Sequence, residues 1–324
     1  MLPAIKLNFP APAQKIQHAD KIMLIGSCFT EHIGKRFADA KFSCLENPHG
    51  ILFNPLSIVH SLRTYLDGKP VIENELFHLN EIWNHWDFHT RFSAFDKVEA
   101  LHEMNASIQS ASSFLKETDW LIITLGSAFQ YFLTENDQDV ANCHRAPGQW
   151  FEKRMLAIEV ITDELQQVIQ DMKAANPKLK VIFTISPVRH IREGVVENNR
   201  SKARLIEAVY ELTNRLDYCH YFPAYEMVID VLRDYRFYDI DLVHPNFAAT
   251  SAVWDYFFDT HFDEATQQLI KSFQEITIAA NHKVRFPETN AYTKFKQNFR
   301  KKIELLQAQC PYVDFEYENT IFSE

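Results

Sequence analysis

The sequence predicts an α/β fold, a three-layer α/β/α sandwich around a parallel β-sheet. Short apolar runs of strand length alternate along the chain with longer amphipathic stretches of helical period, which is the pattern of successive βαβ units. Several runs end in short loops that contain Gly, Ser or Pro, at the strand ends that face the binding crevice of such a sheet. With 324 residues, 46% of them hydrophobic, the chain can bury the core of one large domain.

The first strand is expected at 21–25, where an apolar run leads into the turn Gly26, Ser27 and Cys28. A helical stretch begins near Thr30, so the turn lies between a buried strand and the start of a helix. Glycine lets the backbone bend there, and the unpaired N–H groups of the helix stabilise an anion. We therefore expect Ser27 or Cys28 to act as a nucleophile if a base can reach the turn.

A second strand and a second helix are expected at 42–45 and 56–66, separated by a loop that contains Gly50. The stretch 68–95 is irregular and rich in Trp and Phe, and we interpret it as an aromatic insertion that covers the site. On a helix, the spacing of its His85 and His89 would put both rings on one face. A metal would need a third ligand, which the spacing does not supply, so no metal site is expected.

Three more helices and three more strands continue the alternation. The helices are expected at 101–114, 152–174 and 202–216, and the strands at 119–125, 180–186 and 219–222. Gly126 and Ser127 follow one of these strands, and His190 follows another. Because the carboxyl ends of parallel strands meet at one edge of the sheet, these three residues are expected near the turn at Cys28.

A hairpin is expected between the strands at 119–125 and 180–186, with 130–133 pairing with 140–144. Asn142 and His144 lie in its second half. The pattern leaves two interpretations open, because these side chains could line the site or brace the hairpin.

The best candidate for the base lies in the segment from Asp239 to Asn246, where Asp241 and His244 have the spacing D-x-x-H. In such a pair the carboxylate orients the imidazole and stabilises its protonated form. His190 is a rival base, but no carboxylate lies three residues before it, as Asp241 does before His244. A helix that starts at Pro245 and Asn246 and runs through 253–262 then completes the alternation, and two further helices are expected at 264–280 and 291–309. The chain thus divides into a domain at 1–262 and a helical extension at 263–324 packed on it.

Charge and composition exclude several classes of function. A net charge of -10 argues against a nucleic-acid surface. No window has eighteen apolar residues and the start lacks an apolar signal region, so neither a membrane span nor a signal peptide is expected. Five scattered cysteines do not form a disulfide framework, so we expect a cytoplasmic protein. Nothing in the sequence requires a cofactor, and a small-molecule or carbohydrate ester is the expected partner.

The turn Gly-Ser-Cys-Phe-Thr from Gly26 to Thr30 resembles the signature of the GSCFA family. Together with the D-x-x-H-P segment ending at Pro245, it also resembles the pattern of the SGNH (GDSL-like) hydrolases, whose fold is flavodoxin-like. That resemblance implies that Cys28 stands at the nucleophile position and that Gly50 N–H stabilises the oxyanion. The chain has Gly126-Ser127 where those enzymes have Gly-x-Asn-Asp, so Asn142 is a candidate replacement for the oxyanion donor.

These residues support three functions. The first is an esterase or deacetylase that acts on a small acyl ester, with Cys28 or Ser27 as nucleophile, His244 as base and Asp241 orienting it. The second is an acyltransferase that uses the same residues under a flap that excludes water. The third is a carbohydrate- or ligand-binding module without catalysis. Fold analogy alone does not decide among them.

Overall fold

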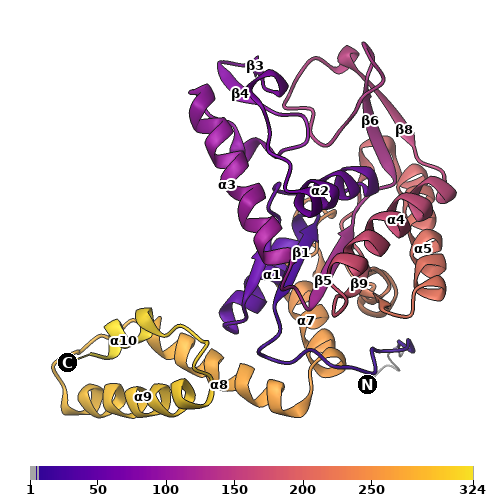
Figure 1. Cartoon of the computed structure of the whole chain (residues 1–324). Coiled ribbons are helices and arrows are strands. Elements are labelled where there is room, and N and C mark those ends of the chain that lie inside the picture. The colour runs from indigo at the N-terminus through magenta and orange to yellow at the C-terminus, as the bar shows by residue number, and fades with distance from the viewer. Residues whose placement is uncertain (1–4, 6, 324) are drawn as a thin grey trace.

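The computed structural model describes residues 5 and 7–323 (Figure 1). Its centre is a parallel sheet of five strands in the spatial order β10-β9-β5-β1-β2. Counted along the chain this order is 2-1-3-4-5, which changes direction between β1 and β5, where doubly wound sheets bind their ligands. The strands are β1 (Ile22–Gly26), β2 (Cys44–Glu46), β5 (Trp120–Leu125), β9 (Lys180–Ile185) and β10 (Cys219–Phe222).

Both faces of the sheet are buried under helices. Met23 and Ile25 of β1 pack into one apolar cluster, and Ile22 and Leu24 pack into another, because successive side chains of a strand point to opposite faces. This is why the strands appear in the sequence as continuous apolar runs. The first cluster includes side chains of α2 (Pro55–Asp67), α3 (Lys97–Leu115), α4 (Ile158–Ala175) and α5 (Val195–Arg215), and the second includes side chains of α1 (Cys28–Asp39) and α7 (Phe247–His261).

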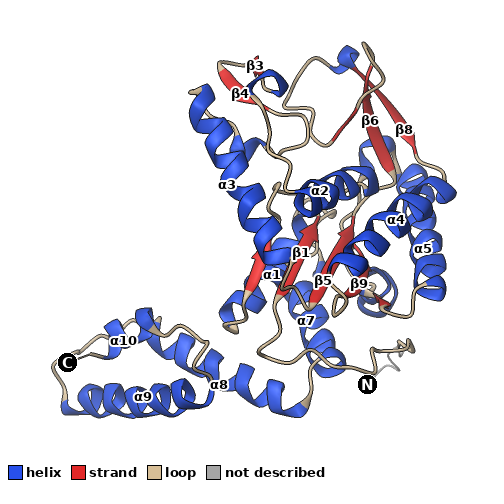
Figure 2. Ribbon diagram, viewed as in Figure 1, coloured by secondary structure: helices blue, strands red, loops and turns tan. Residues whose placement is uncertain are grey.

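Two small antiparallel ribbons lie on the side of the sheet to which the parallel strands point (Figure 2). One belongs to the aromatic insertion and consists of β3 (Phe77–Leu79) and β4 (Ile82–Asn84). The other has the order β7-β6-β8, with β6 (Phe129–Leu133), β7 (Asp139–Val140) and β8 (Phe151–Met155). Both ribbons therefore lie next to the carboxyl edge of the sheet, where the predicted site residues follow the strands.

The C-terminal helices form a separate apolar cluster that includes Phe273, Ile303 and Phe315. These helices, α8 (Glu264–Ala280), α9 (Asn290–Gln309) and α10 (Glu316–Phe322), extend away from the sheet (Figure 1). They contact the rest of the chain through an ion pair of 2.8 Å between Lys41 Nζ and Glu318 Oε1. Neither they nor any other helix in the described part of the chain is long and apolar enough to cross a membrane. Residues 1–4, 6 and 324 of the two expected domains lie outside the described residues.

The α/β fold with a parallel sheet and C-terminal helices is confirmed, but two local predictions are wrong. The helix expected at 152–174 begins only at Ile158, because 151–155 form β8 and pair with β6 along its whole length. Tertiary pairing has overridden the helix propensity of Glu, Lys and Arg. The helix expected from residue 202 already begins at Val195, behind Gly194. The helix expected to start at Pro245 and Asn246 is confirmed, with Asn246 as its N-cap. A short α6 (Ala224–Glu226) and a π-helical turn follow β10.

Candidate functional site

The turn after β1 is fixed by close backbone contacts. Gly26 has φ +151°, and a Cβ added to it would lie 2.3 Å from the carbonyl oxygen of Thr124 on the neighbouring strand. Its N–H donates to Asn47 Oδ1 at 2.8 Å, and the N–H of Ser27 donates to Thr124 O at 3.3 Å. Because a side chain has no room at Gly26, the sequence must have glycine here. The turn therefore holds the next two residues in one place at the edge of the sheet.

Ser27 and Cys28 have different environments. Ser27 is 2% exposed and caps α1, with its Oγ accepting the N–H of Phe29 at 3.3 Å. Cys28 is the first residue of α1 and is partly exposed. Burial raises the pKa of its thiol, the Glu31 carboxylate raises it further, and Lys202 opposes the rise. The helix N-terminus therefore does not make this cysteine a free thiolate at neutral pH.

The two glycines expected to line an oxyanion hole already donate their N–H groups. Gly50 N–H donates to the carbonyl of Asn47 at 2.7 Å, and Gly126 N–H donates to the carbonyl of Phe53 at 2.7 Å. Gly50 has φ +83°, and a Cβ there would lie 2.1 Å from the Cβ of His89. The structure thus gives both glycines a role in close backbone packing and contradicts the expectation that Gly50 N–H is available to an oxyanion.

Asp241 and His244 form the pair that their spacing predicts. His244 Nδ1 lies 2.6 Å from Asp241 Oδ2, and Asp241 Oδ1 accepts the N–H groups of Val243 and His244 at 2.9 and 3.0 Å. These donors lower the pKa of the Asp241 carboxyl to about 2. The N–H of Arg189, in the loop after β9, donates to Val243 O at 3.2 Å. The pair is therefore tied to the carboxyl edge of the sheet while its side chains stay about half exposed.

His190 lies deeper at the same edge. Its Nε2 is buried without a hydrogen-bond partner among the described residues, and a Cβ added to Gly126 would be 3.3 Å from this atom. Its N–H donates to Asn198 Oδ1 at 2.8 Å. Burial lowers the pKa of the imidazole to about 4, and the charges of Lys202, Lys153 and His244 lower it further. His190 is therefore neutral at physiological pH and has an imidazole nitrogen without a partner.

Lys202 is a buried cation beneath the site. It is 1% exposed, and its Nζ donates to the carbonyl oxygens of Gly126 and Ser186, each at 2.6 Å. These oxygens follow the ends of β5 and β9, so the lysine joins two neighbouring strand ends. Burial lowers its pKa to about 7, while Cys28 raises it. The charge of Lys202 lowers the pKa of both Cys28 and His190. The charge of His244 also lowers the pKa of His190. These four residues therefore gather around one edge.

Ser127, Asn142 and His144 have structural contacts. The Ser127 hydroxyl lies 3.3 Å from that of Ser201 and accepts the N–H of Phe129 at 3.2 Å. Asn142 donates its N–H to Trp86 O at 3.1 Å. His144 Nε2 lies 2.8 Å from the carbonyl oxygen of His85. The last two contacts join the hairpin to the aromatic insertion, while the side-chain Nδ2 of Asn142 is buried without a partner among the described residues. His144 therefore braces the hairpin, and the side chain of Asn142 keeps both interpretations.

The aromatic insertion has a different local structure from the one its histidine spacing suggested. His85 and His89 do not share a helix: His85 follows β4, and His89 caps a short 3-10 turn by accepting the N–H of Arg91. His89 nevertheless covers the Gly50 loop, because its N–H donates to His49 O at 2.8 Å. In the described part of the chain no group of three or more His, Cys, Asp or Glu has the arrangement of a metal site.

Two important residues were not found from the sequence. Asn47 holds Gly26 with its side chain and Gly50 with its carbonyl, and its Nδ2 is buried without a partner among the described residues. Its position before Pro48 indicated a loop but no contact. The sequence did not indicate that Lys202 is buried at the site. Lysine is almost never fully buried, and the sequence around it has the pattern of an ordinary amphipathic helix.

Comparison of the sequence with family profiles identifies the family of this chain. Residues 21–257 match the profile of the GSCFA family, and residues 273–324 match that of the GSCFA domain protein, C-terminal domain. No curated protein sequence matches the chain significantly. The first match contains the Cys28 turn and the Asp241–His244 pair. Because it covers well over half of the 324 residues, the protein belongs to the GSCFA family.

Proposed function

We propose that this chain is an SGNH-like hydrolase, an esterase or deacetylase, that cleaves a small acyl ester. The observation that carries the proposal is the contact of 2.6 Å between His244 Nδ1 and Asp241 Oδ2. It leaves the Nε2 of His244 to accept a proton from a nucleophile, so it supplies the His–Asp half of a nucleophile-His-Asp triad. Asp241 is the positioning residue, because it touches only the imidazole and its own loop.

Cys28 is the better nucleophile of the two candidates. Ser27 is almost fully buried, and its hydroxyl caps α1, whereas Cys28 is partly exposed at the start of that helix. Because burial raises the pKa of the Cys28 thiol, the thiol needs a base before it can attack at neutral pH. His244 supplies that base in the proposal.

The reaction has two balanced steps. His244 takes the proton of the Cys28 thiol, and the sulfur attacks the ester carbonyl. The alcohol leaves with the proton from His244, and a thioester remains. Water then gives a proton to His244, attacks the thioester and releases the acid, and the proton returns to the sulfur. The N–H of Cys28, which begins α1 and lacks a partner within the helix, is the donor we assign to the oxyanion.

Two features of the fold favour the SGNH-like assignment. The strand order 2-1-3-4-5 brings β1 and β5 together at the point where the chain reverses direction. Helices on both faces of the sheet correspond to a three-layer arrangement. The nucleophile then follows the first strand, and the base precedes the helix after the last strand, on the same edge.

A second candidate is a ligand-binding module without turnover. It is favoured by the N–H groups of Gly50 and Gly126, which are already donated to carbonyls, and by the raised pKa of the Cys28 thiol. Both features reduce the capacity of the edge to form and stabilise a tetrahedral intermediate. Such a module would use the unpartnered Nε2 of His190 to orient its ligand.

The deciding experiment is incubation of the full chain with p-nitrophenyl acetate, followed by peptide mass spectrometry. We expect an acetyl adduct on Cys28 that disappears in Cys28→Ala and forms far more slowly in His244→Ala. Cys143 is also partly exposed, and burial raises its pKa to about 11, so it is an internal control for nonspecific acetylation. His102→Ala, at an exposed position of α3, is the matched histidine control.

The possible results separate the functions. An adduct on Ser27 in place of Cys28 would retain the hydrolase and change its nucleophile. An acyl-enzyme that is stable in water but transfers its acetyl group to added glycerol would identify an acyltransferase. Equal labelling of Cys28 and Cys143, or no labelling, would overturn the catalytic proposal and favour the binding module.

A further inference from the structure

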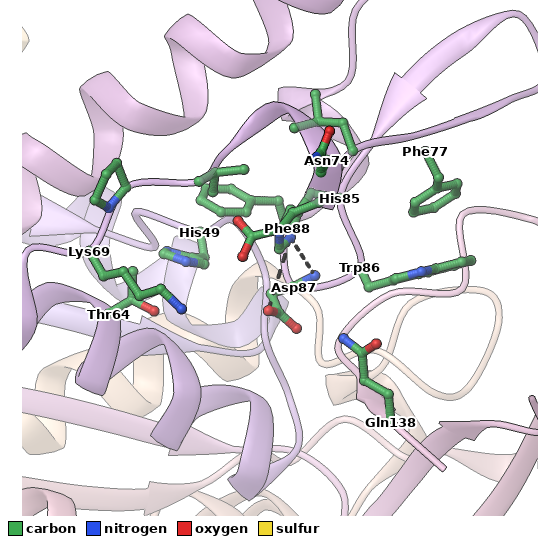
Figure 3. A pocket seen from close by; sticks show the side chains of 14 residues that line it. His49, Thr64, Lys69, Asn74, Phe77, His85, Trp86, Asp87, Phe88 and Gln138 are labelled. Carbon is green, nitrogen blue, oxygen red and sulfur yellow. Dashed lines mark hydrogen bonds and ion pairs between the residues drawn. The ribbon is translucent and has the colours of Figure 1, made fainter. Parts of the chain in front are cut away.

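A cavity of about 400 Å³ lies beneath the aromatic insertion (Figure 3). Its walls come from the end of α2, the loop 69–76, the segment 85–88 and the turn between β6 and β7. This volume is within the range of small-molecule sites. Of the described residues that line it, none belongs to the Cys28 turn or to the Asp241 loop. The cavity is therefore separate from the proposed catalytic edge.

Two pairs of stacked rings border the cavity, of which Phe77 and Trp86 are partly exposed, while His49 and Phe88 are only 2% and 1% exposed. Phe77 and Trp86 stack with ring centres 3.7 Å apart, and His49 and Phe88 stack at 3.8 Å. In Figure 3 the two pairs lie on different sides of the cavity. His49 Nδ1 lies 2.6 Å from the Tyr65 hydroxyl, which fixes its ring. These faces are rigid before any ligand arrives, so binding would cost little ordering of the walls.

Polar groups lie between these walls. The backbone N–H of Asp87 donates to His85 Nδ1 at 3.1 Å, and burial lowers the pKa of this imidazole. The neutral ring therefore carries its proton on Nε2. The Asp87 carboxylate accepts no hydrogen bond from another described residue, and its Oδ2 lies as far as 4.0 Å from His85 Nδ1. Figure 3 shows Asp87 and the Gln138 amide within the lining. The Asp87 carboxylate and the Gln138 amide thus offer an acceptor and a donor to the cavity.

The charges argue against a strongly ionic ligand. The positive charge of Lys69 would repel a cation. The carboxylates of Asp87 and Glu75, which line the same cavity, would repel an anion. A neutral ring that carries several hydroxyl groups avoids both conflicts. One of its C–H faces can pack on the partly exposed Trp86, its hydroxyl hydrogens can go to the Asp87 carboxylate, and its oxygens can accept from Gln138 and His85.

We propose that this cavity is a carbohydrate-binding site for one or two neutral sugar rings. The indole of Trp86 gives the sugar its apolar contact, and Asp87 and Gln138 fix its orientation. The site does not depend on the hydrolase proposal, since no residue of the proposed triad lines it.

Titration calorimetry of the full chain tests the site with five probes, namely glucose, galactose, N-acetylglucosamine, maltose and cellobiose. We expect saturable binding of at least one sugar. Asp87→Asn preserves the shape of the side chain but removes an acceptor charge, and Gln138→Ala removes a rim amide. Each is expected to weaken binding by about tenfold. Trp86→Ala is expected to weaken it at least as much, because a stacking face is lost.

Matched controls keep the result interpretable. Glu103→Gln removes an exposed carboxylate of α3, and Trp150→Ala removes an indole that is 40% exposed outside the cavity. Neither is expected to change the affinity. Thermal melting establishes that each variant is folded. The proposal is overturned if none of the five sugars binds, if choline or inorganic phosphate binds in their place, or if Asp87→Asn and Gln138→Ala both leave the affinity unchanged.

Discussion

His244 Nδ1 and Asp241 Oδ2 lie 2.6 Å apart on one loop, while Asp241 Oδ1 accepts the N–H of His244 itself. One carboxylate therefore holds both the backbone and the ring of the same histidine. Leu242, inside this loop, has φ +57°, so the short loop bends sharply to bring the two side chains together. The Nε2 of the ring is left free of Asp241, which is the feature that the proposed mechanism uses.

Replacing Asp241 with Asn should slow the chemical step. The amide keeps the shape of the carboxylate but cannot stabilise the imidazolium, so we expect kcat for p-nitrophenyl acetate to fall by roughly 100- to 10,000-fold. KM should change little, because Asp241 does not touch the substrate in the proposal. Steady-state kinetics measure both constants.

The matched control for this prediction is Asp239→Asn, since Asp239 is an exposed carboxylate two residues away that makes its contact through the backbone. It should retain the kcat of the unaltered protein. A similar fall in kcat for both variants would indicate a general effect of charge on the loop and would count against a specific role of Asp241.

The raised pKa of the Cys28 thiol should be visible in its reaction with iodoacetamide. The thiolate is the reactive form, so the pH midpoint of alkylation of Cys28 should lie above that of the same cysteine in urea-unfolded protein. Peptide mass spectrometry at a series of pH values measures the rate for this residue. A midpoint below that of the unfolded chain would mean that the start of α1 activates the thiol, contrary to the effect of burial.

Lys202 should make stability depend on pH. Burial lowers its pKa to about 7, while an unfolded chain keeps the ordinary value of about 10.4. Between these values the unfolded state holds a proton that the folded state has released, so the free energy of unfolding rises with pH by at most about 1.4 kcal/mol per unit. Below about pH 7 both states hold the proton, and this contribution becomes constant.

Urea unfolding of the unaltered protein and of Lys202→Met at about pH 7 and about pH 9 checks this sign. The free energy of unfolding of the unaltered protein should gain about 1–3 kcal/mol relative to the variant over this interval. Lys301→Met, at an exposed position of α9, should follow the unaltered protein. Parallel pH profiles for the unaltered protein and Lys202→Met would show that Lys202 remains charged when buried.

Gly26→Ala should destabilise the fold strongly. The new Cβ would lie 2.3 Å from Thr124 O at a φ of +151°, so the turn or the strand would have to move. We expect the free energy of unfolding to fall by about 2–4 kcal/mol in urea unfolding. Gly148→Ala is the control, because no atom lies within 4 Å of its added Cβ, and its effect should stay within about 0.5 kcal/mol. Equal effects would mean that the turn tolerates a side chain.

Local sequence patterns were sufficient for the strands and for the contact between Asp241 and His244. The buried strands consist of apolar residues on both faces, so their runs are visible without knowledge of the fold. Asp241 and His244 are three residues apart, and a contact at this spacing depends mainly on the local backbone. The turn at Gly26 was visible for the same reason, since a glycine between an apolar strand and a helix is a local signal.

Predictions failed where partners are distant in the chain. Strand β8 contains good helix formers, and its pairing with β6 decided its conformation. The N–H of Gly50 was assigned to a ligand, but the bend at Asn47 directs a carbonyl to it. The sequence left Asn142 and His144 open between the site and the hairpin, and only the packing against the insertion shows that the His144 ring contacts the carbonyl of His85.

The sequence by itself determined the α/β alternation, the glycine turn, the Asp241–His244 pair and the family, because each depends on residues close together in the chain. Tertiary structure alone decided which groups at the sheet edge are free and which are already paired. Lys202 is 76 residues from Gly126 and 16 from Ser186, yet it donates to both of their carbonyls. The cavity beneath the insertion likewise joins His49, Trp86 and Gln138. Such long-range contacts arise from packing of whole elements, which no local pattern encodes.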